Sequence, residues 1–224
     1  IPQIVLALIL AAWFTDNHNK LKGTGSYKVM MYMPNIITAA TTALLFYQLF
    51  NVNGTITKTL IKAGLVNSNG FIEKGWGSLL LVAFIQFWMW YGNTMIVLIA
   101  GILGINPSLY EAAMVDGATS KQQFFKITIP LLRPILQYTM VTSAIGGLQM
   151  YDIPQLLNEG GPLVKIGNKA VLSTTTVVML IKKYASTGGS VENFGRASAY
   201  SVVLFLVTLV VSMIFYRLTA KKAV

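Results

Sequence analysis

The sequence predicts an all-α fold, a polytopic membrane helical bundle of about five spans, on two observations. Only 11% of the 224 residues are charged and 54% are hydrophobic, whereas a soluble domain carries about 25% charged residues. The apolar residues also gather into long segments, and the mean hydropathy is +0.63. Because a backbone in lipid must be hydrogen-bonded internally, these segments are expected to be helices. The composition argues against a soluble enzyme and excludes a disordered chain or a coiled coil.

The expected spans follow from the lengths of the apolar segments, which cover residues 1–14, 29–50, 79–103, 131–151 and 199–218. The last four reach the roughly 20 residues that cross hydrocarbon as a helix. The first, Ile1–Phe14, is shorter and lacks the charged start of a signal peptide. We therefore expect it to be the end of a helix that begins upstream, and we interpret residues 1–224 as one N-terminally truncated transmembrane domain.

The connections between these segments are expected to be turns and interfacial elements. In residues 51–77, Asn53-Gly54, Gly64, Gly70 and Gly75 are expected to mark turns. The apolar run Ala170–Ile181 is too short to span and is expected to be re-entrant or interfacial. The pair Lys182-Lys183 is expected to face lipid headgroups.

The distribution of basic residues weakly predicts the orientation. Nine of the 17 Lys and Arg residues lie in the 15–28 loop, the 104–133 stretch and the C-terminal tail, which we assign to the cytoplasm. These nine are Lys20, Lys22, Lys28, Lys121, Lys126, Arg133, Arg217, Lys221 and Lys222. The net charge of +10 is attributed to residues beside anionic headgroups, and no nucleic-acid partner is expected.

The sequence contains few of the residue types that commonly form catalytic or metal-binding sites. There is no cysteine, and the only histidine is His18, which is expected in a solvated loop. These counts exclude disulfides, thiolate metal sites and a histidine-based triad within the chain. We expect no catalytic residue, no metal site and no enzymatic activity.

A polar stretch between the third and fourth apolar segments is the most informative part of the sequence. Ser108 and Glu111 have capping-box spacing, so a helix is expected to begin there and to end at Gly117. Ser120 and Gln123 have the same spacing and predict a second short helix. The small residues near Gly117 would let another protein surface approach closely. A plain surface turn, with Glu111 only capping, is the alternative.

This stretch resembles the cytoplasmic coupling motif of the permeases of ABC importers. The resemblance rests on Glu111-Ala112-Ala113, Gly117, Ile127 and Ile129-Pro130, and Ile129 stands where that motif has Leu. The segment Tyr151–Pro162 is similar to the aromatic-Asp segment ending in Gly-Gly-Pro of carbohydrate (maltose-type) permeases, and Asn193–Ser201 also resembles theirs. Asn158 and Glu159 stand where that family often has Thr and Gly.

The resemblance implies a membrane-spanning permease subunit of an ATP-driven, binding-protein-dependent importer for a sugar or oligosaccharide. It further implies a multi-pass protein of a bacterial or archaeal plasma membrane. The implied partners are ATP-binding cassette subunits, a second related permease subunit and an extracytoplasmic solute-binding protein. ATP would be bound by the partners, since this chain has no phosphate-binding loop, and no cofactor is expected. The implied coupling segment is 107–130, with coupling residues Glu111, Ala112, Ala113, Asp116, Gly117 and Ala118.

Polar and aromatic side chains within the spans are candidates for the solute path, because polar groups in lipid should face a pore. These candidates are Gln86, Trp90, Asn93, Gln149, Tyr151 and Asp152. Gln86, Trp90 and Asn93 have helical spacings of four and three and should share a face. Interfacial anchoring and hydrogen bonds between helices are the alternative roles.

The solute and the class of function both have alternatives at this point. The solute could be different, because the coupling motif also occurs in permeases for amino acids, glycerol phosphate and other small solutes. The two other classes of function are a secondary carrier and an intramembrane enzyme. A secondary carrier would need charged residues deep in the spans, and the segments here have almost none. An intramembrane enzyme ranks last.

Overall fold

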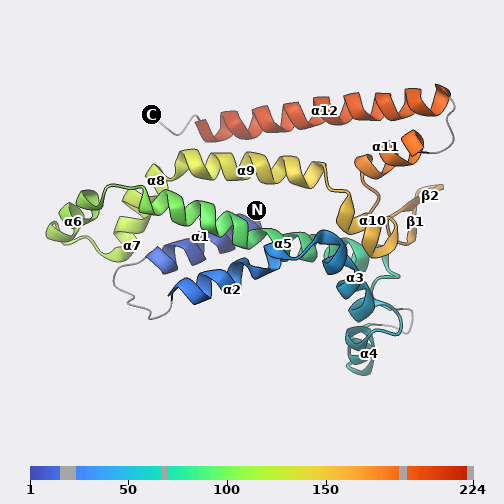
Figure 1. Ribbon diagram of the computed structural model, residues 1–224, viewed down its shortest axis with the longest axis horizontal. Helices are drawn as coiled ribbons and strands as arrows, with labels where there is room; N and C mark the ends of the chain where they lie inside the picture. Colours follow the sequence, from blue (N-terminus) through green and yellow to red (C-terminus); the bar gives the residue numbers. More distant parts are fainter. Residues whose placement is uncertain (16–23, 67–69, 187–190, 221–224) are drawn as a thin grey trace. The chain divides into compact units, whose positions relative to one another are not determined.

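The computed structural model describes residues 1–15, 24–66, 70–186 and 191–220. His18, Lys20, Lys22, Lys221 and Lys222, on which part of the orientation rests, lie outside the described residues. The chain forms two compact units, one of residues 1–36, 87–144 and 210–224 and one of residues 37–86 and 145–209. Both are built almost wholly from helices, in agreement with the predicted all-α class (Figure 1).

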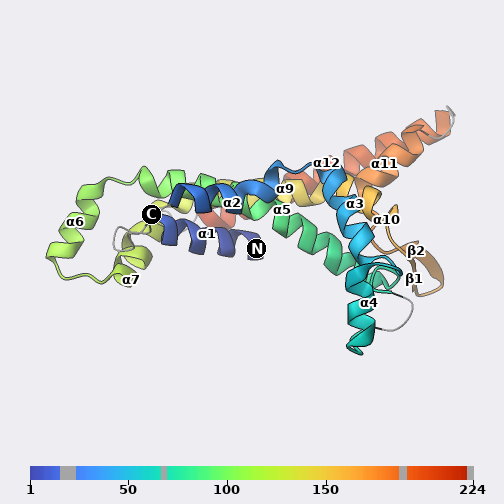
Figure 2. The ribbon, with the colours of Figure 1, turned by 60° about the horizontal axis from the view of Figure 1, so that its bottom comes forward.

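The first unit is a helical bundle. It contains α1 (Pro2–Thr15), α2 (Thr24–Ile36), the second part of α5 (Gly75–Leu103), α6 (Pro107–Val115), α7 (Ser120–Gln123), the π-helix η1 (Phe124–Thr128), α8 (Ile129–Leu131), most of α9 (Arg133–Leu148) and the end of α12 (Val191–Ala220). Figures 1 and 2 both show α1 and α2 lying along α5.

Small side chains bring α1 and α2 against α5. Ala7 and Ala11, fully buried and four residues apart, form one face of α1 that packs with Met95 and Leu98. A Cβ atom on Gly92 would lie only 2.5 Å from the carbonyl oxygen of Met31 in α2, so a glycine is required there. A small residue on one helix at each of these contacts, alanine on α1 and glycine on α5, lets the helices approach closely, as is common among membrane helices.

The second unit joins short helices to a β-hairpin. It contains α3 (Ala39–Phe50), α4 (Thr55–Lys62), α10 (Asp152–Asn158), β1 (Leu163–Ile166), β2 (Lys169–Leu172), α11 (Val177–Ser186) and the first parts of α5 and α12. The strands pair antiparallel, with Leu163 opposite Leu172 and Ile166 opposite Lys169. The two-residue turn between them begins with Gly167 at φ +61°, where a hairpin of this kind favours glycine.

The predicted spans agree with the structure in kind and differ in detail. Among the described residues, α5 and the 193–217 part of α12 are long and apolar enough to cross a membrane, and α2 with α3–α4 passes the same test only as a broken pair. The apolar α1 has 14 residues and α9 has 16, so both are shorter than the roughly 20 residues of a full span. The expected single helix over 29–50 is wrong, because Thr38 is extended and caps α3 by accepting a hydrogen bond from the N–H of Thr41 at 3.3 Å.

The connections between the predicted spans contain elements that the sequence did not predict. The glycines of residues 51–77 were expected to mark turns, and Gly64 and Gly70 do have left-handed backbones, but the segment also includes α4. The apolar run Ala170–Ile181 was expected to be one re-entrant or interfacial segment, but it divides between β2 and α11. The division follows from the hairpin, because the first residues of the run satisfy their backbone groups by pairing with β1.

Candidate functional site

The helix α6 begins two residues before its predicted start. Asn106 is the N-cap, and its side-chain oxygen accepts a hydrogen bond from the N–H of Ser108 at 3.1 Å. Pro107 follows at the first helical position, which suits its fixed φ. The predicted Ser108–Glu111 capping box is therefore wrong. As a result the Glu111 carboxylate is not used in the cap, and among the described residues it has no hydrogen bond or ion pair.

The predicted end of α6 at Gly117 is confirmed. Gly117 has φ +75°, and its N–H donates to the carbonyl of Met114 at 3.0 Å while that of Ala118 donates to Ala113 at 2.8 Å. These two bonds form a Schellman motif, the usual glycine-dependent end of a helix. A Cβ on Gly117 would meet nothing within 4 Å. The glycine is therefore required by the left-handed backbone and not by crowding within this chain.

The second short helix begins one residue before its prediction. Thr119, not Ser120, is the N-cap of α7, in a capping box with Gln122. Gln123 is instead buried, and its Nε2 donates to the carbonyl of Ala118 at 3.2 Å. This bond ties the start of the second helix to the turn that ends the first.

A π-helix connects α7 to α8. Within η1 the N–H of Ile129 bonds to the carbonyl of Phe124, five residues back. Pro130 has no N–H to give to Lys126, so an α-helical ladder would leave that carbonyl without its bond, and the wider turn lies just before this proline. The hydroxyls of Tyr110 and Thr128 lie 2.8 Å apart and share a hydrogen bond. This contact joins α6 to η1.

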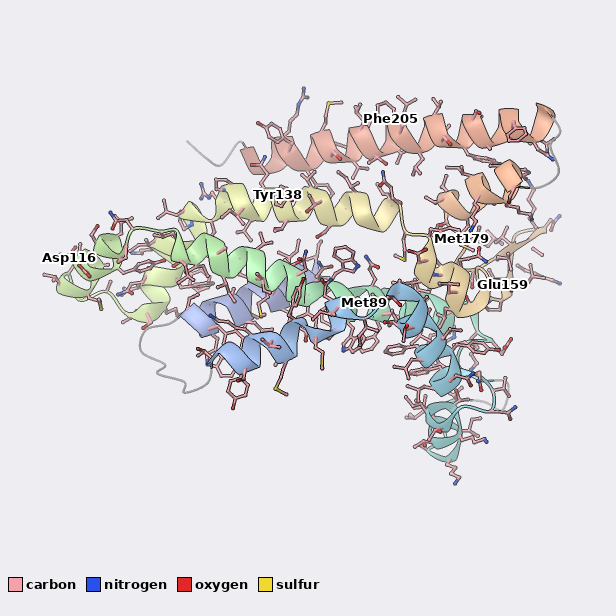
Figure 3. All side chains as sticks on the ribbon, in the orientation of Figure 1. Met89, Asp116, Tyr138, Glu159, Met179 and Phe205 are labelled. Atoms are coloured by element: carbon pink, nitrogen blue, oxygen red, sulfur yellow. The ribbon has the colours of Figure 1, made fainter. Side chains whose placement is uncertain are left out.

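The candidate coupling residues form the outer surface of this loop. Glu111, Ala112, Asp116 and Gly117 are exposed, whereas Ala113 and Ala118 are half-buried. Figure 3 shows Asp116 at the tip of the loop that contains α6. Three apolar side chains that the sequence analysis did not single out are also exposed on α6, namely Leu109, Met114 and Val115. Val115 is 88% exposed, and its signal in the sequence was an apolar residue directly before the polar Asp116-Gly117 turn.

The solute-path candidates on α5 keep their helical spacing. Gln86 and Asn93 are half-buried, and Trp90 is 43% exposed. Among the described residues, no hydrogen bond joins the side chains of Gln86 and Asn93 to a partner. A polar contact between α1 and this part of α5 involves other side chains: Gln3 Nε2 donates to Thr94 Oγ1 at 2.8 Å. The role of these two amides in a solute path stays a prediction.

The remaining path candidates lie around the start of α10. Tyr151 is half-buried, and its hydroxyl accepts a hydrogen bond from Lys182 Nζ at 2.5 Å, with the same nitrogen 4.5 Å from the ring centroid. Lys182 therefore contacts Tyr151, the N-cap residue of α10. The sequence analysis had expected it to face lipid headgroups. Asp152 is exposed in the first turn of α10, where a carboxylate interacts favourably with the helix dipole. Gln149 is exposed and has no described partner.

The Gly-Gly-Pro turn is held tightly by the residues before α11. A Cβ on Gly160 would lie 2.6 Å from Thr175 Oγ1, and one on Gly161 would lie 2.5 Å from Ser173 Oγ. Glu159, directly before them, has φ +53° and is the only described residue other than glycine with positive φ. The family resemblance suggests Gly at this position, and the left-handed backbone gives the physical reason for that preference.

Asn158 connects this turn to the start of α5. Its Nδ2 donates to Ser78 Oγ at 2.8 Å, and its Oδ1 accepts from Thr174 Oγ1 at 3.3 Å. The Ser78 hydroxyl in turn donates to the carbonyl of Ile72 at 2.6 Å. This network fixes the turn after α10 to the elements on both sides of it.

A family match defines the class of protein, a component of a transport permease. Residues 1–223 match the family described as "Binding-protein-dependent transport system inner membrane component", and the chain belongs to this family. The family membership inferred from Glu111–Pro130 is thereby confirmed. The functional roles assigned to individual residues stay predictions.

Named relatives cover most of the chain. It is 31% identical over 225 residues to the lactose transport system permease protein LacF of Rhizobium radiobacter, which covers 98% of this chain and 71% of that protein. It is 26% identical over 221 residues to the multiple sugar-binding transport system permease protein MsmF of Streptococcus mutans, covering 99% of this chain and 71% of that protein.

A solved structure confirms the fold. It is a bacterial alginate ABC transporter in complex with an alginate pentasaccharide-bound periplasmic protein, with a TM-score of 0.75 at 21% identity. The match covers 99% of this chain and 72% of that one. The polytopic helical permease fold is thus shared.

Proposed function

We propose that this chain is the permease subunit of an ATP-driven importer for a sugar or oligosaccharide, spanning a bacterial or archaeal plasma membrane several times. Its relatives include permeases named for lactose, multiple sugars and arabinooligosaccharides. These names favour a carbohydrate over an amino acid or glycerol phosphate. The chain forms half of the translocation path, a second related permease forms the other half, and a solute-binding protein delivers the sugar from outside.

The coupling part of the proposal is that α6 docks into a cleft of an ATP-binding subunit. The observation that carries it is the unpaired surface of this helix. Glu111 and Asp116 have no partner among the described residues, and Val115 is exposed beside them. The carboxylates would pair with basic groups of the ATPase, while Ala112, Ala113, Gly117 and Ala118 allow close approach. ATP is bound by those subunits, and this chain supplies neither a cofactor nor a catalytic group.

The contacts inside the first unit suggest how the motion would be transmitted. The Tyr110–Thr128 hydrogen bond holds α6 against η1, and the Gln123–Ala118 bond ties α7 to the turn that ends α6. A force applied to α6 would therefore reach the start of α9 without first unfolding the loop. Rigid-body movement of this kind is a common way to switch access across a membrane. In this proposal the solute contacts some of Gln86, Trp90, Asn93, Gln149, Tyr151 and Asp152.

The absence of cysteine from the sequence permits a direct test. A single cysteine at Val115, 88% exposed, should photo-cross-link to the ATP-binding subunit in the assembled complex through a short maleimide–benzophenone reagent, whose benzophenone needs no thiol on the partner. The matched control is a single cysteine at Leu65, 72% exposed after α4 in the other unit, which should not cross-link. Cross-linking from Leu65→Cys but not from Val115→Cys would overturn the proposed docking surface.

A further inference from the structure

A cavity of about 430 Å³ lies in the first unit behind the proposed docking helix. The ends of α1 and α5 form one side, and α6, α7 and η1 form the other; Figures 1 and 2 both place α7 beside the end of α1. Its lining consists of Ala12, Trp13, Thr15, Ile102, Leu103, Ile105, Pro107, Tyr110, Met114, Ser120, Lys121, Gln123, Phe124 and Thr128. Its volume is in the range of small-molecule sites.

Most of the polar lining already has partners within the chain. Thr15 donates to the carbonyl of Ala11 at 2.8 Å, Tyr110 and Thr128 bond to each other, and Gln123 bonds to Ala118. Two neighbouring polar side chains, Ser120 and Lys121 in the first turn of α7, have no partner among the described residues. The cavity therefore has one polar end with unused hydrogen-bond donors.

The rest of the lining is apolar and incompletely covered. Trp13 is 48% exposed, Leu103 67% and Met114 48%. Lys121 is the one charged residue in the lining, and no acidic side chain accompanies it. A ligand that fits must present a hydrocarbon portion to one end and an anionic group to the other.

We propose that this cavity binds an anionic phospholipid, with its phosphate at Ser120 and Lys121 and part of an acyl chain against Trp13, Leu103 and Phe124. A lipid is the occupant that matches both ends, and a component of an inner membrane is always in contact with it. Its assignment to the cytoplasmic leaflet rests on the proposed function. A bound lipid would fix the angle of α6 and α7 relative to α1, so the lipid would regulate coupling.

The test uses phosphatidylglycerol with a photoactivatable group in its acyl chain, added to the purified complex that contains the ATP-binding subunits. After illumination, peptides containing Trp13 and Phe124 should carry the label. Lys121→Glu should lower this labelling by about fivefold, because one basic residue near a headgroup contributes about that factor. Lys126→Glu is the matched control, since Lys126 is exposed on η1 outside the lining and its replacement should leave the labelling unchanged.

Competitors identify the source of the anionic group. Excess unlabelled phosphatidylglycerol should abolish the labelling, whereas phosphatidylcholine and inorganic phosphate should not. Displacement by inorganic phosphate would overturn the lipid assignment, as would equal labelling in wild type and Lys121→Glu, or an equal loss in Lys126→Glu. Because labelling is measured without transport, its result stands apart from whether α6 docks on an ATPase.

Discussion

The ends of α4 and α6 have the same local geometry and different surroundings. Gly64 follows α4 at φ +71° and Gly117 follows α6 at φ +75°. Both complete a Schellman motif, since the N–H of Gly64 donates to Ile61 and that of Leu65 to Leu60, each at 3.0 Å. A Cβ on either glycine would meet nothing within 4 Å. The two glycines are therefore interchangeable as backbone elements.

What differs is the charge of the helix that each glycine ends. α4 carries Lys58 and Lys62 and no acidic residue, whereas α6 carries Glu111 and no basic residue, with Asp116 at its C-cap. A Schellman glycine is thus not evidence of a docking site by itself. The family motif around Gly117, together with the unpaired carboxylates, is what sets α6 apart.

Replacing the two glycines with aspartate should give the largest difference. The backbone cost of a left-handed side chain, about 1–2 kcal/mol, applies equally to both sites. Gly117→Asp should in addition block the approach of the ATPase and lower sugar uptake by about tenfold or more, while ATP hydrolysis continues. Uptake and hydrolysis in proteoliposomes would measure this. Gly64→Asp should insert and transport normally, and equal loss in both variants would remove the functional distinction.

Charge reversal should have the next largest effect. Glu111→Lys with Asp116→Lys should weaken binding of the ATP-binding subunit several-fold, since each exposed ion pair contributes about 0.2–1 kcal/mol. The effect should shrink at high salt because exposed pairs are screened. The recovery of ATPase with the affinity-purified permease over a salt series would report it. Lys58→Glu with Lys62→Glu on α4 should leave recovery unchanged; a matching loss there would point to net charge instead.

The start of α6 should respond to the loss of its cap more modestly. Asn106→Ala should destabilise the loop by about 1 kcal/mol, the usual value for an N-cap. Ser108→Ala should have almost no effect, because only the N–H of residue 108 takes part in the cap. Hydrogen exchange of the amides in α6 would separate the two. Greater protection loss in Ser108→Ala than in Asn106→Ala would restore the capping box expected from the sequence.

The smallest effect should come from a third helix end. Glu159 caps α10 with a left-handed backbone that Gly64 and Gly117 adopt without strain. Glu159→Gly should therefore raise the free energy of unfolding by up to about 1 kcal/mol. Glu159→Ala is the control, because it removes the carboxylate and keeps the strained backbone. Thermal unfolding in detergent would compare them, and stabilisation by alanine as large as by glycine would assign the effect to the charge.

The sequence was sufficient for features set by local pattern. Long apolar runs predicted α5 and α12, and the glycine signal predicted the end of α6, because both depend on neighbouring residues only. The start of α6 was displaced because two capping signals overlap, Asn106-Pro107 and Ser108–Glu111, and the proline fixed the choice. The break at Thr38 was missed because the apolar residues on both sides were given more weight than Pro34 and Asn35 just before it, which are turn signals.

Long-range contacts could not be read from the sequence. The Tyr151–Lys182 contact joins residues 31 apart, and the Tyr110–Thr128 bond depends on how α6 folds back on η1. The hairpin was missed because its strands have only four residues each, although its two-residue turn, Gly167-Asn168, is a hairpin signal in the sequence. The candidate coupling segment could be proposed from its motif alone, whereas the exposure of Val115 required coordinates.

The π-helix at Phe124–Thr128 has an angular consequence. One residue advances an α-helix by about 100°, at 3.6 residues per turn. A wider turn that accommodates an additional residue therefore rotates the segment before it, including α6, about the helix axis relative to α9. Deleting one residue from this segment would remove that offset and point α6 toward a different quadrant, although every side chain of α6 itself would be unchanged.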